Sequence, residues 1–181
     1  MGGKFMELKI GKVKVEIIQG DIAEQDVDAI GLAANDRLWM GGRVADAIKR
    51  KAGEDIETEA MKQGPLNIGE VAITSGGELS INKILHAVVM GQDLAPTPDT
   101  ISQGTKNLLI KADELGIDSL AIPAFGTGMA KIPARDSAKA MVEQIIDALL
   151  NAQNLKELRI VLHNEGIYNA FAEEFSKKFT R

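Results

Sequence analysis

Two glycine-rich turns, each placed between an apolar segment and a helical segment, most constrain how this chain can fold. The first contains Gly41 and Gly42, and it follows the apolar residues 29–34. The second, residues 126–128, follows the apolar residues 119–123. Glycines let a ligand approach the backbone, and the free amides and positive end of a helix N-terminus attract anions. Each turn is therefore a candidate phosphate or carboxylate site.

Alternating apolar and polar residues predict an opening β-hairpin. They cover residues 5–10 and 13–18, on either side of Gly11-Lys12, and a tight turn can join two such strands. After the hairpin, short apolar segments alternate with helical patterns. Strands are expected at residues 28–34, 69–74, 84–90, 119–123 and 157–163, and helices at residues 44–52, 55–63, 99–115, 138–150 and 167–179. This order predicts an α/β fold, a three-layer α/β/α sandwich with a central mixed β-sheet.

Three local features add detail to this pattern. Asp99 is expected to cap the third helix, and Gly116 is expected to end it. Residues 90–98, which contain one glycine and two prolines, predict a mobile loop. His86 lies within an apolar strand, so we expect an interior histidine with a satisfied hydrogen bond.

The charge of the chain excludes one class of partner. The formal net charge is −5 at pH 7, and no run of Lys or Arg is present. The overall field therefore does not attract a polyanion, and any phosphate site must be local. With only 4% aromatic residues, single-stranded nucleic acid is also not an expected partner. The 181 residues, 45% of them hydrophobic, fit one domain, expected to span residues 1–181.

Cysteine, metal and membrane chemistry are not expected. The chain has no cysteine, which excludes disulfides, thiolate metal sites and a cysteine nucleophile. No cluster of His, Asp and Glu has metal-ligand spacing, so we predict no metal and no cofactor. The first residues form no apolar leader, and no apolar run approaches about 20 residues. The sequence thus predicts no membrane span and a cytoplasmic protein.

The ordered motifs Gly20-Asp21-Ile22, Ala33-Ala34-Asn35, Gly41-Gly42 and Gly126-Thr127-Gly128 resemble those of the macro domain, an ADP-ribose-binding α/β module. The resemblance runs from about Leu8 to Phe179. It implies a crevice at the carboxyl ends of the strands, where open α/β sheets bind their ligands. It also implies that the partner is ADP-ribose, or a protein modified by ADP-ribose.

The resemblance implies a role for residues at the adenine end. Asp21 would accept the adenine amino group, and the backbone of Ile22 would contact the ring. His163 follows the last strand, where many family members carry an aromatic ring that stacks on adenine. Two simpler readings stay open, because Asp21 can merely start a turn and His163 can merely pack at a strand end.

The resemblance places the rest of the ligand between the two glycine-rich turns. Asn35, after Ala34, would contact the distal ribose, although Asn also supports turns well. Backbone amides would hold the diphosphate, and Met129 would line the pocket or simply fill the core. The residues implied at this end are Ala34, Asn35, Gly41, Gly42, Arg43, Val44, Gly126, Thr127, Gly128 and Met129.

The chain departs from the family pattern at three positions inside the site. Leu32 stands where Asn is frequent, and Arg43 stands where a third Gly is usual. Arg43 can contact phosphate or ribose, fill the crevice and reject the ligand, or point to solvent, and Asp46 is close enough in sequence to pair with it. Ala45 replaces the Asp of the most active hydrolase branches, which removes a general acid/base.

Binding of ADP-ribose is therefore the leading function. The alternative is a slow hydrolase of ADP-ribosyl esters or O-acetyl-ADP-ribose, or an ADP-ribose-1″-phosphate phosphatase, with Asn35 as the candidate catalytic residue. A further alternative is a degenerate domain that acts as an interaction scaffold.

Overall fold

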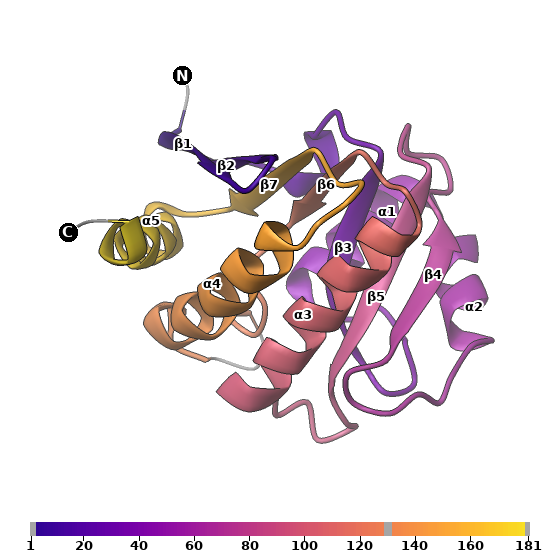
Figure 1. Ribbon diagram of the computed structural model, residues 1–181. Coiled ribbons are helices and arrows are strands. Elements are labelled where there is room, and N and C mark those ends of the chain that lie inside the picture. The colour runs from indigo at the N-terminus through magenta and orange to yellow at the C-terminus, as the bar shows by residue number, and fades with distance from the viewer. Residues whose placement is uncertain (1–2, 129–131, 180–181) are drawn as a thin grey trace.

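The computed structural model describes residues 3–128 and 132–179, and it contains a mixed seven-stranded sheet (Figure 1). The strand order is β1-β2-β7-β6-β3-β5-β4. Strands β1 and β4 run antiparallel to their neighbours, and the five strands between them are parallel to one another. The strands are β1 (Phe5–Ile10), β2 (Val13–Gln19), β3 (Ala29–Asn35), β4 (Val71–Ser75), β5 (Lys83–Met90), β6 (Ser119–Ile122) and β7 (Glu157–Leu162).

Helices cover both faces of the sheet, which confirms the predicted three-layer α/β/α sandwich (Figure 1). The first face carries α1 (Arg43–Ala52) and α2 (Asp55–Met61), with the 3₁₀ turn η1 (Ile22–Glu24) beside them. The second face carries α3 (Pro98–Glu114), α4 (Ala134–Leu150) and α5 (Glu165–Phe179). Three groups of buried apolar side chains join these helices to the sheet. One lies on the face that carries α3, α4 and α5, and two smaller ones lie on the face that carries α1 and α2. The predicted opening hairpin is also confirmed, in β1 and β2.

Helix α3 packs very close to the sheet because a glycine stands at the contact on each side, Gly31 in the sheet and Gly104 in the helix. A Cβ on Gly31 in β3 would lie 2.7 Å from the Leu108 side chain. A Cβ on Gly104 in α3 would lie 2.5 Å from Val89 of β5. Both contacts are shorter than real Cβ contacts, so glycine at these positions fixes where α3 and its preceding loop lie.

The cap of α3 differs from the predicted one. Thr97, rather than Asp99, is the N-cap residue, and Pro98 occupies the first position of the helix. Thr97 Oγ1 accepts the Thr100 amide at 3.1 Å, and Thr100 Oγ1 accepts the Thr97 amide at 2.9 Å. This reciprocal pair satisfies two free amides at once, and proline suits the first helical position, so the helix begins earlier than Asp99 would allow.

His86 is an interior residue of β5, as predicted. Its side chain is buried, and Nε2 lies 3.0 Å from Thr74 Oγ1 on the neighbouring strand β4. Burial lowers the pKa of His86 to about 4, and the nearby charge of Glu59 opposes this shift only in part. The folded protein therefore favours the neutral form of the His86 imidazole.

The free energy of unfolding should fall as the pH drops from about 6.5 to about 4. In this range the unfolded chain protonates His86 and the folded chain does not, because the pKa is 6.5 in the first and about 4 in the second. The loss should approach about 3 kcal/mol. Denaturant unfolding as a function of pH measures it. The variant His86→Gln should lose this part of the slope, whereas His163→Gln should keep it; equal slopes in the wild type and in His86→Gln would contradict the assignment.

Candidate functional site

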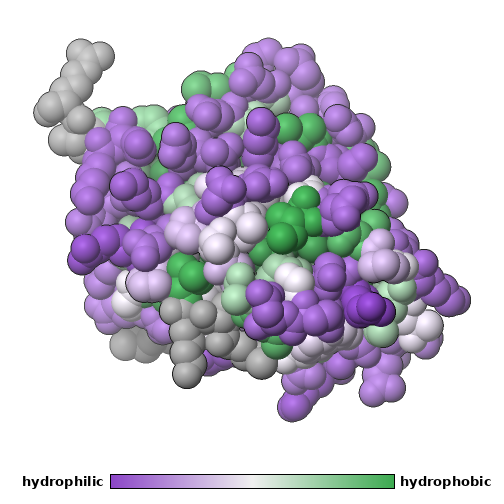
Figure 2. Space-filling model, turned by 90° about the horizontal axis from the view of Figure 1, so that it is seen from below, coloured by the Kyte–Doolittle hydropathy of each residue, from purple (hydrophilic) through white to green (hydrophobic). Residues whose placement is uncertain are grey.

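Five parallel strands end at one edge of the sheet, and a crevice lies along this edge. The last strand residues are Gln19 in β2, Leu162 in β7, Ile122 in β6, Asn35 in β3 and Met90 in β5. Figure 2 shows this edge, with apolar surface near its centre and hydrophilic surface around it. A crevice at this position is where open α/β sheets bind ligands.

The crevice has two connected parts. The groove, of about 570 Å³, lies at the β2 and β7 end. The inner pocket, of about 110 Å³, lies at the β3 and β5 end. The two parts adjoin at Arg43, Val44, Pro123 and His163, which border both. The other residues that line the groove are Gly3, Gln19, Gly20, Asp21, Ile22, Ala47 and Val161. The other residues that line the inner pocket are Leu32, Ala33, Ala34, Asn35, Trp39, Gly42, Ala45, Val89, Met90, Leu94, Pro96, Ala124, Phe125, Gly126, Thr127, Gly128 and Leu162.

The first glycine-rich turn presents an open helix N-terminus to the crevice. Gly42 is the N-cap of α1 and provides no side-chain cap. The amides of Arg43, Val44 and Ala45 lie in the first turn of the helix and have no partner within it. Gly41 has a different task, because a Cβ there would clash with the Trp39 ring. The two predicted glycines thus have different roles. Gly42 borders the inner pocket, and Gly41 leaves space for the Trp39 ring.

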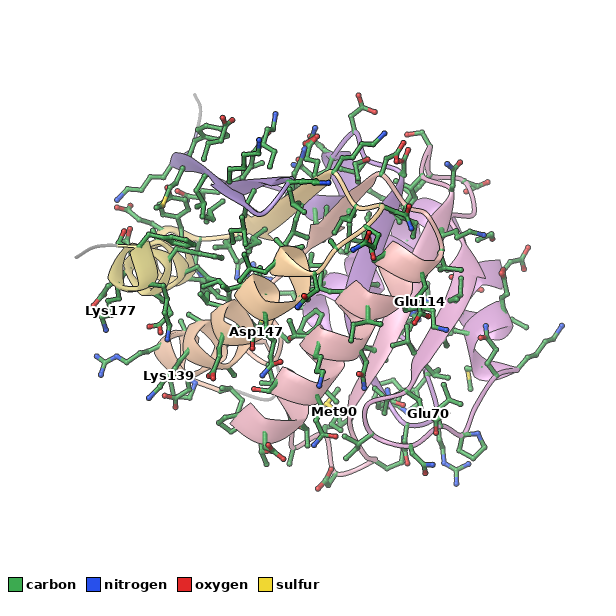
Figure 3. All side chains as sticks on the ribbon, in the orientation of Figure 1. Glu70, Met90, Glu114, Lys139, Asp147 and Lys177 are labelled. Atoms are coloured by element: carbon green, nitrogen blue, oxygen red, sulfur yellow. The ribbon has the colours of Figure 1, made fainter. Side chains whose placement is uncertain are left out.

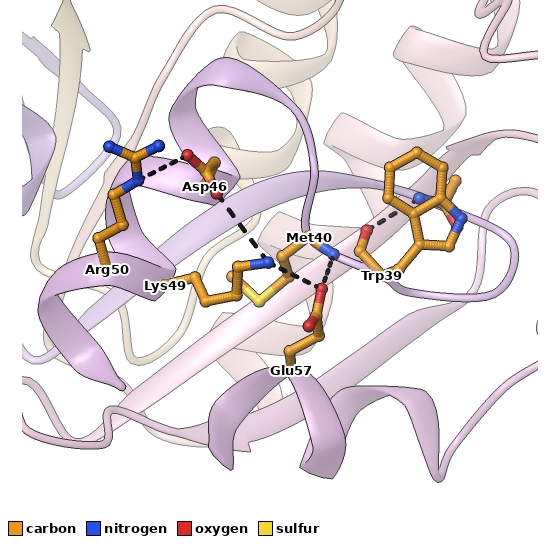
Figure 4. Close-up of polar contacts among 7 residues, drawn as sticks. Trp39, Met40, Asp46, Lys49, Arg50 and Glu57 are labelled. Carbon is orange, nitrogen blue, oxygen red and sulfur yellow. Dashed lines mark hydrogen bonds and ion pairs between the residues drawn. The ribbon is translucent and has the colours of Figure 1, made fainter. Parts of the chain in front are cut away.

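A network of charged side chains from α1 and α2 holds this turn in place (Figure 4). Glu57 Oε2 accepts the Met40 amide at 2.6 Å and the Lys49 ammonium at 3.2 Å. Asp46 pairs with Arg50 Nε at 2.9 Å and with Lys49 Nζ at 3.9 Å. Because α2 supplies Glu57 and α1 supplies Lys49, the network fixes the turn against both helices.

Arg43 borders both parts of the crevice and is exposed to solvent. The neighbour considered from the sequence, Asp46, pairs with Arg50 instead, and no other acidic partner of Arg43 is found in residues 3–128 and 132–179. A Cβ on Gly128 would lie 3.9 Å from the Arg43 Cβ, so the two glycine-rich turns face each other here. The exposed Arg43 side chain, without an acidic partner among these residues, starts beside the point where the two turns meet and makes it the natural position for an anion.

Asn35 is buried, and both ends of its carboxamide are engaged by protein groups. Nδ2 donates to the Trp39 carbonyl at 2.9 Å. Oδ1 accepts the amides of Arg37 and Leu38, both at 3.0 Å, and the Gln92 side chain at 3.1 Å. These bonds show the turn-supporting role that was left open from the sequence. Contact of Asn35 with a ribose, and any catalytic role, stay predictions.

Gln92 ties the two loops at the β5 end of the inner pocket together. Trp39 Nε1 donates to Gln92 Oε1 at 2.9 Å, and Gln92 Nε2 donates to Asp36 Oδ1 at 2.6 Å. The loop predicted to be mobile, residues 90–98, thus contacts the loop between β3 and α1 through Gln92, and its Pro96 is buried. Sequence reasoning missed Trp39 as a pocket residue, although the chain's only tryptophan, two positions before the glycine pair, was a usable signal.

The second glycine-rich turn rests on a buried anchor. The Phe125 carbonyl accepts Ser137 Oγ at 2.7 Å, and the Phe125 amide points to Met141 Sδ at 3.3 Å. Phe125 is therefore both a core residue and part of the pocket wall. Gly126 has a φ of +82°, a conformation that favours glycine. Gly126, Thr127 and Gly128 all border the inner pocket, and Met129 lies outside the described residues.

The three residues implied at the adenine end lie along the groove. Asp21 caps η1, with Oδ1 accepting the Ala23 amide at 2.9 Å and Oδ2 lying 3.5 Å from Lys51 Nζ. Ile22 is buried below it. His163 stands exposed after β7, and burial of the ring together with the charge of Arg43 lowers its pKa. At neutral pH the His163 ring is therefore neutral.

Residues 3–128 and 132–179 contain neither a cluster of metal-binding side chains nor a helix that could span a membrane. No group of three or more His, Cys, Asp or Glu side chains there could hold a metal ion. Within the same residues, no helix combines the length and the apolar character that crossing a bilayer requires.

The chain is similar to the macro domain family, whose model matches residues 32–141. An uncharacterized protein of Pyrobaculum aerophilum is 38% identical over 176 residues, which cover 95% of this chain and 96% of that protein. An uncharacterized protein of Sulfurisphaera tokodaii is 36% identical over 92% of this chain and 93% of its own length.

Solved structures agree with this similarity. A macrodomain variant of Oceanobacillus iheyensis with ADPR has a TM-score of 0.89 and 26% identity, covering 98% of this chain and all of that chain. The macrodomain of the same organism with ADP has a TM-score of 0.83 and 27% identity, covering 97% of this chain and 96% of that chain. A Trypanosoma brucei macrodomain in complex with ADP-ribose shares the fold, at a TM-score of 0.79 and 24% identity, over 88% of this chain and 68% of that chain.

Removal of Glu57 should release the first glycine-rich turn. In Glu57→Ala the Met40 amide loses its acceptor, so its hydrogen exchange should become at least about tenfold faster. Amide exchange followed by NMR measures this directly. Glu59→Ala is the matched control, because Glu59 accepts the Ser75 amide at 2.7 Å at the end of β4: it should accelerate Ser75 and leave Met40 unchanged. Unchanged Met40 exchange in Glu57→Ala would contradict this role.

Proposed function

Because the chain belongs to the macro domain family, we propose that it binds ADP-ribose, free or attached to a protein, along the crevice. The observation that carries this proposal is Arg43 beside the open N-terminus of α1, at the junction of the groove and the inner pocket, with no acidic partner in the part of the chain that the structure describes. An anion at this junction leaves room for a base on one side and a sugar on the other.

The groove suits the adenosine part of the ligand. Asp21 is held by the Ala23 amide, so its orientation is fixed before a ligand arrives. Its carboxylate has spare acceptor capacity and can take up the adenine amino group. His163 is neutral and exposed at the rim, and a neutral imidazole can stack on the adenine ring without an added cost of burying charge.

The junction suits the diphosphate. The amides of Arg43, Val44 and Ala45, which have no partner within α1, lie in its first turn, and the helix dipole adds a favourable potential. The side chain of Arg43 supplies a charge-assisted hydrogen bond. The net charge of the whole chain is −5, so attraction of a diphosphate depends on this local arrangement.

Binding is favoured over turnover by the lining of the inner pocket. Within the described residues, no Asp, Glu, Lys or Cys lines it. Ala45 borders the pocket at the position considered for a general acid/base, and Asn35 is engaged by its own loops. Hydrolysis of ADP-ribosyl esters or of O-acetyl-ADP-ribose would therefore have to proceed without a side-chain carboxylate. Release of free ADP-ribose from an ester-modified protein would reverse this preference.

Arg43→Ala should weaken ADP-ribose roughly tenfold to hundredfold. A charge-assisted hydrogen bond contributes about 1.5–3 kcal/mol, which corresponds to that range. Isothermal titration calorimetry measures the affinity. Arg50→Ala is the matched control, because Arg50 lies on the same helix and pairs with Asp46 away from the crevice; it should keep the wild-type affinity. Tighter binding in Arg43→Ala would mean that Arg43 plugs the crevice, and the scaffold function would then be preferred.

Asp21 should recognise adenine by accepting a hydrogen bond from its 6-amino group. Wild-type protein should bind ADP-ribose more tightly than the analogue in which hypoxanthine replaces adenine, because only adenine donates a hydrogen bond from its 6-amino group. In Asp21→Ala the two affinities should become similar, with ADP-ribose losing about 1–3 kcal/mol. Calorimetric titration of both ligands into both proteins gives the four affinities that this comparison needs. A preference that survives in Asp21→Ala would place adenine elsewhere.

A further inference from the structure

Strand β1 ends the sheet on the side away from β4, and one of its two edges is open (Figure 1). It pairs with β2, and no other strand in the described part of the chain pairs with it. The Lys4 carbonyl accepts the Gln19 amide, so the backbone groups of the even-numbered residues face β2. Because these groups alternate along a strand, the N–H and C=O of Phe5, Glu7 and Lys9 point away from β2. They form an edge that another strand can extend.

The two faces of β1 differ in character. Met6, Leu8 and Ile10 contribute to the core that α3, α4 and α5 share, but Met6 and Leu8 are only partly buried there. Glu7 and Lys9 alternate with these residues and are exposed on the opposite face. The open edge therefore combines incompletely covered apolar side chains with two charges of opposite sign.

Glu7 and Lys9 each face a like charge on β2. Glu7 stands opposite Glu16, and Lys9 stands opposite Lys14. Glu16 and Lys14 pair with each other at 2.8 Å, whereas neither Glu7 nor Lys9 forms an ion pair with any residue that the structure describes. Like charges directly opposite each other across two strands are unfavourable, and opposite charges there are favourable. Opposite charges for Glu7 and Lys9 can therefore come only from the open side of β1.

A second copy of β1 supplies these opposite charges in one register. Two antiparallel copies continue the sheet only when odd positions face odd positions and even positions face even ones. With Leu8 opposite the partner's Leu8, Glu7 faces the partner's Lys9, and the two-fold symmetry repeats this pair on the other side. A register centred on Glu7 or on Lys9 would instead place two identical charges opposite each other. Charge therefore selects the register centred on Leu8.

The same register also joins the backbone edges and the apolar faces. Glu7 and the partner's Lys9 carry outward backbone groups, so they exchange two hydrogen bonds, and the symmetric pair exchanges two more. On the other face Met6 lies opposite the partner's Ile10, so the partly buried Met6 and Leu8 lose exposed apolar surface. An edge strand that is protected against pairing carries charges that repel a copy of itself, whereas Glu7 and Lys9 attract one.

We propose that the chain forms a symmetric dimer through β1, with Leu8 at the two-fold axis and Glu7 paired with the partner's Lys9. The axis stands perpendicular to the sheet, so strand direction reverses from one protomer to the other. The two crevices therefore open at opposite edges of the joined sheet, and a dimer carries two ligand sites that face opposite ways. The dimer does not rest on the proposed function, because none of the β1 residues, all of which the structure describes, lines the groove or the inner pocket.

Exchange of charge at positions 7 and 9 tests the pairing. Sedimentation velocity of the full chain at rising concentration should show wild-type monomers forming dimers. Glu7→Lys and Lys9→Glu should each weaken dimerisation roughly tenfold or more, because both interface pairs then carry like charges. An equimolar mixture of the two variants should dimerise again, since each supplies the charge that the other lacks. Both variants should fold, because each removes a like-charge pair within the hairpin.

Two matched controls repeat these charge changes elsewhere. Glu114→Lys lies at the end of α3 and Lys139→Glu lies on α4, both at exposed positions away from β1 (Figure 3). Each control should dimerise as the wild type does. Equal weakening in the controls would mean that net charge, and not the β1 edge, sets the association.

A single cysteine tests the register, because the chain has none of its own. In Leu8→Cys the two β-carbons should lie about 4.5 Å apart across the axis, and a disulfide needs about 3.5–4.5 Å. Met6→Cys is the matched control, since Met6 is also partly buried on the same face. It faces the partner's Ile10, so its two copies lie four residues apart along the strands, or roughly 14 Å. Mild oxidation followed by non-reducing electrophoresis should link Leu8→Cys faster than Met6→Cys.

Several results would overturn the dimer. They are a wild-type chain that stays monomeric at millimolar concentration, a mixture of folded Glu7→Lys and Lys9→Glu that stays monomeric, and equal disulfide formation in Leu8→Cys and Met6→Cys. Circular dichroism shows whether each variant is folded, and the cysteine test stands even if a charge variant is not. Calorimetry with ADP-ribose reports separately on the proposed function. Binding by a chain that never dimerises would overturn the dimer alone, and a dimer without binding would overturn the proposed function alone.

Discussion

The uncapped N-terminus of α1 is the feature on which the crevice depends. Its free amides are useful only while the turn before the helix is held open, and hydrogen bonds from two directions do this. Glu57 holds the Met40 amide from the α2 side, and the Asn35 carboxamide holds the Trp39 carbonyl from the end of β3. A side-chain cap would have stabilised the helix by about 1 kcal/mol, but its oxygen would occupy the place proposed for the diphosphate.

Much of the fold was predictable because it follows from local periodicity. The opening hairpin, the alternation of strands and helices and the two glycine-rich turns all appear where the pattern of apolar residues puts them. What failed depended on competition between neighbours. Thr97 outcompetes Asp99 as a cap because Thr100 returns the hydrogen bond. Of the alternatives left open for Arg43, a pair with Asp46 is not formed, because Asp46 pairs with Arg50 and Lys49. Neither choice is visible from sequence spacing.

The outline of the candidate site was predictable, but the part of the inner pocket formed by Trp39, Leu94 and Pro96 was not. The residues implied at the adenine end and the glycine turns line one crevice, except Gly41, which makes room for Trp39. Trp39, Leu94 and Pro96 come together only through tertiary contacts, and the Gln92 bonds that join their loops span more than fifty residues. The Asn35 carboxamide supports these loops, and its contact with a ribose stays a prediction.

A crystal structure with ADP-ribose soaked into the crystal tests the central claim most directly. The account predicts the base in the groove beside Asp21, the diphosphate within hydrogen-bond distance of the first amides of α1, and Arg43 along the rim next to a phosphate oxygen. A crevice that stays empty at millimolar ADP-ribose, with the Arg43 side chain lying between the turns formed by Gly41-Gly42 and Gly126-Thr127-Gly128, would contradict it.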